Sequence, residues 1–292
     1  MILMVRGFAW LVTAIWLLVA SAAIAAAQPQ PLRVMTFNVR LPLEQDGVNQ
    51  WRFRRELAAN VITRTKPDIV GTQELHKVQG DDLLARLPGY AWFGIDRRGG
   101  HGDEHMGIFY RHDRFRLIEL GNFWLSDTPA VPGSISWGHP YPRMVTWGLF
   151  ETKADGRRFY VLNTHFPYRA EDGEARLKAA RMIRQHIDAL APGIPVILTG
   201  DFNTEPDSAV HALLTDALTD ARVTAPVKAG PEATYHAYQG TGDRRIDWIL
   251  SRGFRAERVE TVADRRGALY PSDHFPVVAD LAWPAAPKDA VP

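Results

Sequence analysis

The chain carries the sequence PVILTGDFN at residues 195–203. Its first part, which ends at Thr199, is an apolar run short enough for a buried strand. Gly200-Asp201-Phe202-Asn203 follows directly and places a carboxylate and an amide immediately after that strand. Polar residues at strand ends are a usual location for functional sites on a β scaffold. The stretch therefore predicts both a buried strand and one edge of a site.

Five other short polar sequences lie where predicted strands stop. Strand ends that each offer an acid, an amide or an imidazole can converge on one side of a pair of packed sheets. The five sequences are Thr36-Phe37-Asn38, Gln73-Glu74, Asn163-Thr164-His165, Arg245-Ile246-Asp247 and Ser272-Asp273-His274.

Taken one at a time, these residues also have structural explanations. An asparagine after a strand, such as Asn38 or Asn203, is usually a turn-former. Asp247 has ion-pair partners available in the neighbouring arginines, and His165 alone would more often be a buried structural histidine. Their joint occurrence in this order is what favours a functional site.

The rest of the chain alternates predicted strands with helices and has no repeat and no long linker. Apolar spacings of three and four residues predict helices, and short apolar or β-branched runs predict strands. The pattern suggests one α/β domain with two sheets packed face to face and helices outside. Helices are expected over 51–65, 174–190 and 207–214, and strands over 32–39, 68–73, 106–110, 115–120, 145–150, 158–164, 195–199, 246–251 and 276–281.

The first residues have the pattern of a secretory leader. Arg6 is the only charge before an uncharged run from Gly7 to Leu32, which passes through Ala25-Ala26-Ala27. A positive start, an apolar stretch and a small-residue exit are typical of a signal peptide, although about 20 apolar residues would also serve as a retained membrane anchor. We expect cleavage near Ala27 and a periplasmic or secreted protein, with the domain over 28–284 and a flexible tail over 285–292.

Composition and charge exclude several kinds of site. The chain has 292 residues, 46% hydrophobic and 23% charged, which is a globular composition. It has no cysteine, so disulfides, thiol catalysis and cysteine-ligated zinc are excluded. Removal of residues 1–27 takes Arg6 from the 34 basic residues and leaves 33, equal to the 33 acidic ones. A neutral domain lacks the basic footprint expected for strong binding of duplex DNA.

The polar residues suit phosphoester hydrolysis with a hard metal ion. Mg²⁺ prefers oxygen ligands, usually one or two carboxylates, with water and phosphate in its remaining positions. A carboxylate can activate a water for attack on phosphorus, while cationic donors offset the developing charge. Other chemistries fit less well, because the chain has neither a Gly-x-Ser-x-Gly elbow nor a His-Glu-x-x-His helix.

With Gly200-Asp201-Phe202-Asn203 and Ser272-Asp273-His274 preceded by Gln73-Glu74, the chain resembles the endonuclease/exonuclease/phosphatase (DNase I-like) superfamily. The resemblance covers about Leu32 to Trp283, and the stretch at 123–129 looks like a bacterial secreted or surface subgroup related to the deadenylase/nocturnin branch. It implies an α/β fold, a four-layer α/β/β/α sandwich with two packed mixed sheets.

The resemblance also implies roles for the residues on the metal side. Glu74 would be the main metal ligand, with Asn38 beside it and Asp273 helping, and the metal would be Mg²⁺ or Mn²⁺. Asp201 would orient and activate the attacking water. Asn203 would hold that water or a phosphate oxygen.

On the phosphate side, His165 and His274 would flank the phosphate as donors. Asp247 would hold His274 in the orientation that presents its other nitrogen to the substrate. Glu104 would orient His165 in the same way, unless it is an ordinary surface glutamate of its loop.

Tyr110 and Arg143 are further candidates for phosphate contacts. Arg143 lies between Pro142 and a predicted strand, where a guanidinium can grip a phosphate oxygen with two hydrogen bonds. The alternative is that the arginine rests on a tryptophan ring.

The sequence therefore predicts a divalent-metal-dependent phosphoester hydrolase that uses in-line attack of an activated water. Trp137-Gly138-His139 and Pro167-Tyr168 depart from related bacterial sequences on the substrate side, so a nucleic acid, a nucleotide, a phospholipid and a sugar phosphate all stay open. The alternative is a non-catalytic binding or virulence-associated module on the same fold, which the complete residue set disfavours. Nothing in the sequence argues for oligomerisation, and we expect a monomer.

Overall fold

A computed structural model describes residues 30–284 of the chain. The predicted leader over 1–27 and the predicted tail over 285–292 lie outside the described residues. Between residues 30 and 284, no helix has the length and apolar character needed to cross a membrane.

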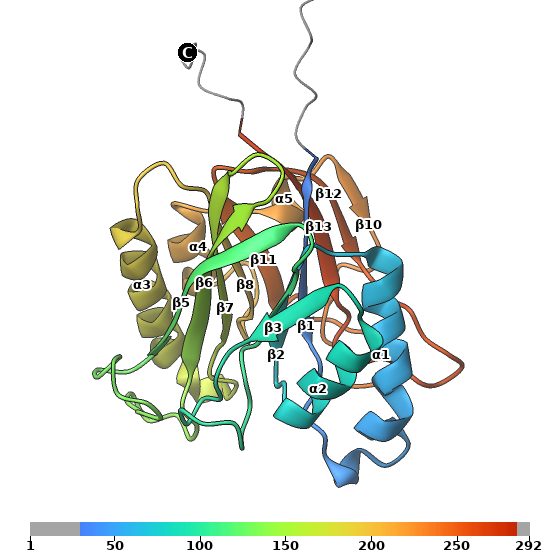
Figure 1. Ribbon diagram of the computed structural model, residues 1–292. Helices are drawn as coiled ribbons and strands as arrows, with labels where there is room; N and C mark the ends of the chain where they lie inside the picture. Colours follow the sequence, from blue (N-terminus) through green and yellow to red (C-terminus); the bar gives the residue numbers. More distant parts are fainter. Residues whose placement is uncertain (1–29, 285–292) are drawn as a thin grey trace, which may run out of the picture.

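Two mixed sheets pack face to face (Figure 1). Strand β1 pairs parallel with β2 and antiparallel with β13, and strand β8 pairs parallel with β7 and antiparallel with β11. The larger sheet has the order β10 (Val227–Ala229), β12 (Arg255–Thr261), β13 (Val277–Ala282), β1 (Leu32–Asn38), β2 (Ile69–Gln73), β4 (Ile108–Arg111) and β3 (Tyr90–Phe93). The smaller has the order β5 (Phe115–Trp124), β6 (Met144–Thr152), β7 (Arg158–His165), β8 (Val196–Asp201), β11 (Asp247–Arg252) and β9 (Thr219–Asp220).

Helices cover the outer faces of both sheets (Figure 1). The larger sheet carries α1 (Trp51–Thr65) and α2 (Lys77–Arg86), and the smaller carries α3 (Gly173–Ala189) and α4 (Ala209–Thr215). The short α5 (Ala221–Thr224) packs against β11 and β12, and two 3₁₀ turns, η1 (Glu44–Asn49) and η2 (Ala170–Asp172), precede α1 and α3.

The alternation of side chains along each strand builds these layers. In β1, Val34 belongs to the core between the sheets, whereas Met35 packs under α1. In β8, Ile197 points into the same central core and Leu198 packs against α3. Full burial of such aliphatic side chains contributes about 1.5–3 kcal/mol each. The predicted four-layer α/β/β/α sandwich is confirmed.

The sheets approach each other closely where β2 crosses β7 and β8. A Cβ on Gly71 would collide with Thr199 Oγ1 and would lie 2.6 Å from Asn163 Oδ1. Asn163 bridges the sheets, because its Oδ1 accepts hydrogen bonds from Gln73 Nε2 at 2.7 Å and from Thr199 Oγ1 at 3.0 Å. This contact fixes the ends of β2, β7 and β8 relative to one another, and the candidate site lies at those ends.

The predicted elements are all present, with boundary shifts of a few residues, and the helix over 51–65 has the predicted bounds. Helix α2 is not predicted from the sequence, and its interior contains Gly80, a residue type that disfavours helices. Gly80 is required there, since a Cβ would lie 2.6 Å from the Trp92 ring. Strand β12 was also omitted, because the register shift between Ala256 and Arg258 breaks its alternating pattern.

Candidate active site

Polar residues from both sheets meet at one end of the sandwich, the lower end in Figure 1. Asn38 ends β1 and Asp201 ends β8, and Asn38 Nδ2 donates a hydrogen bond to Asp201 Oδ2 at 3.0 Å. The strand register places His165 and Asp247 beside Asp201 on its two neighbouring strands. Antiparallel strands contribute their first residues to this end, and parallel strands their last.

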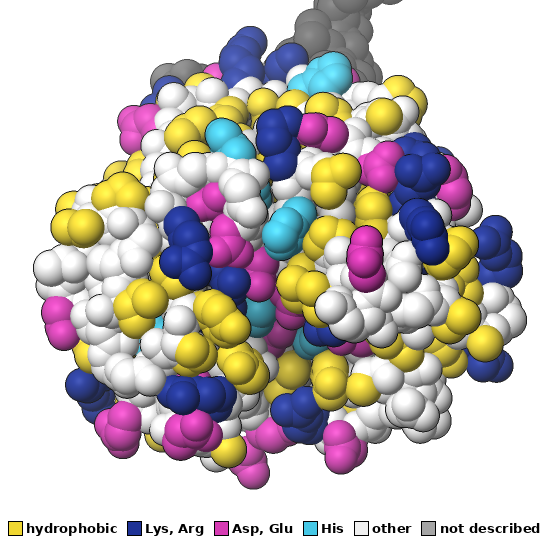
Figure 2. Space-filling view, turned by 90° about the horizontal axis from the view of Figure 1, so that it is seen from below, with side chains coloured by type: hydrophobic (Ala, Val, Ile, Leu, Met, Phe, Trp, Pro, Cys, Tyr) yellow, Lys and Arg dark blue, Asp and Glu magenta, His cyan; other side chains and the backbone are white. Residues whose placement is uncertain are grey.

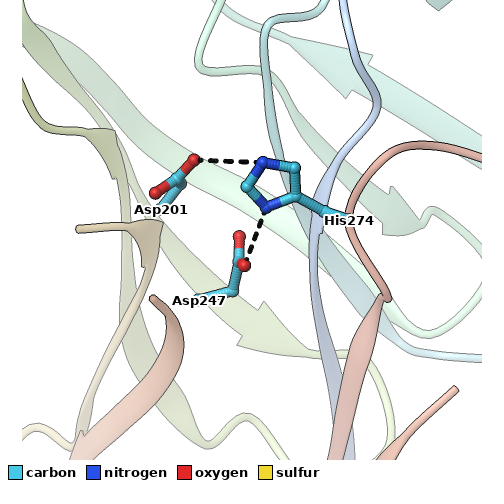
Figure 3. Close-up of side chains that lie close together, drawn as sticks. All are labelled: Asp201, Asp247 and His274. Atoms are coloured by element: carbon cyan, nitrogen blue, oxygen red, sulfur yellow. Dashed lines mark hydrogen bonds and ion pairs between the residues drawn. The ribbon is translucent and has the colours of Figure 1, made fainter. Parts of the chain in front are cut away.

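Asp247, His274 and Asp201 form a chain of contacts (Figure 3). His274 Nδ1 is hydrogen-bonded to Asp247 Oδ2 at 2.9 Å, and His274 Nε2 lies 3.7 Å from Asp201 Oδ2. All three side chains are buried. The predicted Asp247–His274 pair is therefore present in the structure.

The second histidine approaches the same carboxylate from the smaller sheet. His165 Nε2 lies 3.5 Å from Asp201 Oδ2, and His165 Nδ1 lies 3.8 Å from Glu104 Oε2. Glu104 is buried and not an exposed loop residue, but it makes its short contact with Arg97, whose Nη1 lies 2.9 Å from Glu104 Oε1. Glu104 thus faces His165 as predicted, at a distance too long for a direct hydrogen bond.

Arg143 lies beside this pair. Its Nη1 is 4.0 Å from Glu104 Oε2, and the residue is only 3% exposed. Three atoms that face one another, Arg143 Nη1, Glu104 Oε2 and His165 Nδ1, have no hydrogen-bond partner within the described part of the chain. Buried polar atoms normally have partners, and a water can donate to Glu104 Oε2 while it accepts from Arg143 Nη1, so a bound water is expected here.

Glu74 lies on the other side of Asp201. It follows β2 with a φ of +57°, a left-handed backbone conformation that turns its side chain away from the strand direction. Asn38 Nδ2 donates to Glu74 Oε1 at 3.1 Å, and the Leu41 backbone N–H donates to Glu74 Oε2 at 3.1 Å. Asp273 lies near, with Oδ2 at 3.8 Å from Arg40 Nη1. The predicted metal-side residues are therefore brought together.

Asn203 is held at the entrance to this cluster. Its backbone has a φ of +51°, and its N–H donates to Asp201 Oδ1 at 3.0 Å. Its side-chain Nδ2 donates to the carbonyl oxygen of Phe166 at 3.1 Å. Because Oδ1 of the amide remains available, Asn203 can still accept a hydrogen bond from a water.

The two histidines have opposite charge preferences. Burial lowers the pKa of His165 well below its ordinary value, and the neighbouring Arg143 lowers it further. Burial also acts to lower the pKa of His274, but the carboxylates of Asp247, Asp201 and Asp273 outweigh it and raise that pKa to about 10. At neutral pH His165 is therefore neutral and His274 is a cation.

The carboxyl groups are crowded together. Burial, followed by the charge of Asp247, raises the pKa of Asp201 to about 7. Burial, followed by the charge of Glu74, raises the pKa of Glu104 to about 7 and also raises the pKa of Asp273. Asp201 and Glu104 therefore titrate near neutrality, the range in which a general base is most effective.

The donor set fits a divalent cation. Glu74 and Asp273 offer hard carboxylate oxygens at one end of the cluster, as Mg²⁺ or Mn²⁺ require. Asn38, predicted as a ligand, presents its amide nitrogen to Glu74 and Asp201, and its Oδ1 accepts a hydrogen bond from the Arg40 N–H at 3.0 Å. A cation there would also offset the repulsion that raises the pKa of Asp273. Asp201, Asp247 and His274 also place ligand atoms within 4.8 Å of one another. In that trio, however, His274 Nδ1 is already engaged by Asp247.

A cleft of about 480 Å³ is lined by Glu74, Glu104, His165, Asp201, Asp273 and His274. Asn38 and Asp247 are hydrogen-bonded to these residues and do not line it themselves. In Figure 2, which looks onto this end, acidic and histidine side chains lie in a hollow with basic side chains beside it. The lining combines the acids and histidines with four arginines, which are Arg40, Arg97, Arg143 and Arg244. A volume of this size suits a small molecule.

Tyr110 is a candidate that does not reach the cleft. It pairs with Ile69 and Ala91 within the larger sheet, and its ring packs on Phe93 and Phe150 in the core between the sheets. Its partner Ile69 begins β2, whereas Glu74 follows the other end of that strand. The prediction of a phosphate contact for Tyr110 is therefore not supported.

One residue that supports the site, Thr234, was not found by sequence reasoning. Thr234 Oγ1 accepts hydrogen bonds from the backbone N–H groups of Ile246 and Asp247 at 3.0 and 3.1 Å. The Thr234 carbonyl oxygen accepts from the Phe275 N–H at 2.7 Å. This threonine joins the segments of Asp247 and His274, and only its position in space reveals that role.

The model of the Endonuclease/Exonuclease/phosphatase family matches residues 35–274. The chain belongs to this family. An endonuclease/exonuclease/phosphatase structure from Bacteroides vulgatus is 33% identical and superposes with a TM-score of 0.83, covering 87% of this chain and 100% of that one. A mannosyl-6-phosphatase from Bacteroides thetaiotaomicron is 32% identical with a TM-score of 0.81, covering 86% and 100%.

The curated relatives are less similar in sequence than these two structures. Human nocturnin is 24% identical over 87% of this chain, which spans 65% of that protein's length. The chain spans less than two thirds of the length of the first curated relatives that it matches. The family and the relatives found by sequence and by structure include phosphodiesterases and phosphatases.

Proposed function

We propose that the protein hydrolyses a phosphoester by in-line attack of a water molecule, with the help of a divalent metal ion. The observation that carries this proposal is the position of Asp201 Oδ2. It lies 3.5 Å from His165 Nε2 and 3.7 Å from His274 Nε2, in a buried cluster shared by both sheets. Such an arrangement offers one base between two donors.

Each side chain has a part in the reaction. Asp201 takes the proton of the attacking water, which Asn203 helps to orient. His274, held as a cation by Asp247, donates from Nε2 to a phosphate oxygen on which charge develops. Neutral His165 and the Arg143 guanidinium hold the other oxygens of the phosphate from the opposite side.

Glu74 and Asp273 would hold the metal, which we expect to be Mg²⁺ or Mn²⁺, and Asn38 would position Glu74 through its amide nitrogen. When bound, the metal supplies Lewis-acid stabilisation of the phosphate and of the leaving oxygen. Arg40 partly offsets the negative charge beside the proposed metal ligands. Its guanidinium contacts Asp46 at 3.0 Å and lies 3.8 Å from Asp273.

The substrate is proposed to be a small phosphate ester, with a sugar phosphate as the preferred class. The cleft volume of about 480 Å³ accommodates a monosaccharide phosphate. The structural relative named as a mannosyl-6-phosphatase shares 32% identity and is covered over its whole length. A nucleotide or a phospholipid headgroup is the competing class.

Export to the periplasm or out of the cell is part of the same proposal. It rests on the sequence of residues 1–27, with Arg6 ahead of an apolar run and Ala25-Ala26-Ala27 at its end. Mass spectrometry of the mature protein should find the chain beginning near Gln28. A mature protein that retains residues 1–27 would contradict it and favour a membrane anchor.

A substrate panel tests the activity directly. Purified protein is incubated with Mg²⁺ or Mn²⁺ and mannose 6-phosphate, a nucleotide, glycerol 3-phosphate, sphingomyelin or single-stranded RNA, and released phosphate or cleaved product is measured. We expect turnover that EDTA abolishes and that added metal restores. No EDTA-sensitive turnover on any member would favour the alternative, a binding module on the same fold.

A further inference from the structure

We propose that Tyr141, Tyr168 and Arg97 form a subsite that binds the sugar ring of the substrate, next to the phosphate position. The inference rests on the proposed phosphoesterase activity and adds the residues that recognise the part of the substrate beyond the phosphate.

The two tyrosines stand out by their exposure. Of the eight tyrosines in the chain, Tyr141 and Tyr168 are the exposed ones, with 39% and 52% of their surface accessible. Exposed aromatic surface is costly, and where it lines a cleft it usually marks a binding site. Both residues line the catalytic cleft.

Their positions in the chain tie them to the phosphate side. Tyr141 precedes Arg143 by two residues, and Tyr168 follows His165 by three. The two rings stack with centroids 6.4 Å apart and planes inclined by 26°. They therefore form one aromatic wall beside the donors that would hold the phosphate.

Arg97 fixes the wall in place. Its guanidinium lies over the Tyr141 ring, 4.6 Å from the centroid, in a cation–π contact. The same guanidinium is held by Asp103 at 3.0 Å and by Glu104 at 2.9 Å, and Arg97 is only 7% exposed. On the backbone side, the carbonyl oxygen of Tyr141 lies 2.7 Å from His139 Nδ1. A wall held from two sides loses little conformational entropy when a ligand binds.

The chemistry of the wall suits a hydroxylated ring. A tyrosine offers an apolar face for the C–H face of a sugar and a hydroxyl that can donate and accept. Neither the Tyr141 hydroxyl nor the Tyr168 hydroxyl has a hydrogen-bond partner among residues 30–284. Arg97 is the charged group that contacts this wall.

The test compares a ring-bearing substrate with an acyclic one. Steady-state kcat/KM is measured for mannose 6-phosphate, glycerol 3-phosphate and adenosine 5′-monophosphate with wild type, Tyr141→Leu, Tyr168→Leu and the double variant. Loss of the aromatic faces should lower the ratio of kcat/KM for mannose 6-phosphate over glycerol 3-phosphate by about tenfold in the double variant, mainly through KM. The Tyr→Phe variants keep the aromatic faces, so this ratio should fall less in them than in the Leu variants.

Phe53→Leu is the matched control. Phe53 is 47% exposed and lies under the Arg52 guanidinium at 4.7 Å, on the outer helix α1 and away from the cleft. Its replacement removes an exposed, arginine-covered ring and should leave the substrate ratio unchanged.

The outcomes separate the two proposals. If wild type hydrolyses phosphoesters but the double Leu variant keeps its substrate ratio within twofold, the ring subsite is wrong and the activity stands. If kcat/KM for adenosine 5′-monophosphate falls more in the variants than kcat/KM for mannose 6-phosphate, the wall binds a base and not a sugar. If wild type hydrolyses none of the three but cleaves sphingomyelin or single-stranded RNA, the phosphoesterase activity stands and the small-ester substrate class is wrong. Calorimetric titration with mannose 6-phosphate then decides the subsite, which requires binding by wild type and weaker binding by the double variant.

Discussion

Two histidines that face one carboxylate differ in charge because of their neighbours. His274 is surrounded by acids and is hydrogen-bonded to Asp247, whereas His165 lies beside the Arg143 guanidinium. The strand-end positions of both histidines were predictable, but their charges were not. The charge of each depends on residues that come from other parts of the chain.

A pH profile of kcat/KM tests these charges. Asp201 has to be ionised to act as a base, so activity should rise as the pH passes through about 7. His274 has to be protonated to act as a donor, so activity should fall as the pH passes about 10. Asp247→Asn removes the charge that raises the pKa of His274 and should move the alkaline limb to lower pH. An alkaline limb that stays in place in this variant would show that His274 is not the group that titrates.

At the scale of elements, the site depends on how loops and strands are joined. Helix α1 and strand β8 were predictable, because local periodicity and a short apolar run determine them. Roles such as that of Thr234 were not, because its hydroxyl bonds a segment twelve and thirteen residues away. The local sequence marks which residues are reactive, and the loops between strands determine how those residues are held.

Thr234→Val should lower kcat by about 10- to 100-fold, since small misplacements of a catalytic group cost that much. The change keeps the shape and leaves the N–H groups of Ile246 and Asp247 without their acceptor. KM should change little, and Thr234→Ser should restore activity. Thr65→Val is the control, because that buried hydroxyl bonds only the Val61 carbonyl within α1. Equal kcat in the Val and Ser variants would contradict the positioning role.

Gly71→Ala tests the contact between the sheets. The added methyl would collide with Thr199 Oγ1 and lie 2.6 Å from Asn163 Oδ1, so the free energy of unfolding should fall by about 1–3 kcal/mol or more. Gly173→Ala is the control, because it starts α3 with helical dihedrals and open space around it. Urea denaturation measures both. An unchanged midpoint for Gly71→Ala would show that the sheets do not pack this closely.

At the scale of the whole molecule, the sandwich brings acids from both sheets to one end. The crowding of Glu74, Asp273 and Glu104 there is unfavourable without a cation. Binding of a metal to the folded state alone should therefore stabilise the entire domain.

Mg²⁺ at saturating concentration should raise the Tm of wild type by about 3 °C or more. Glu74→Gln should abolish this shift, because it removes the proposed main ligand. Glu56→Gln, a change to an exposed carboxylate on α1, should preserve it. Loss of the shift in Asp247→Asn but not in Glu74→Gln would place the metal at the Asp201–Asp247–His274 trio instead.

The most direct test of the account is the turnover of Asp201→Ala on a phosphoester that wild type hydrolyses. Asp201 is the buried carboxylate between the two histidines, and no other acid lies between them among the described residues. The account predicts a loss of kcat of at least about 100-fold, with circular dichroism and Tm showing an intact fold. A folded Asp201→Ala protein that retains turnover within severalfold of wild type would contradict it.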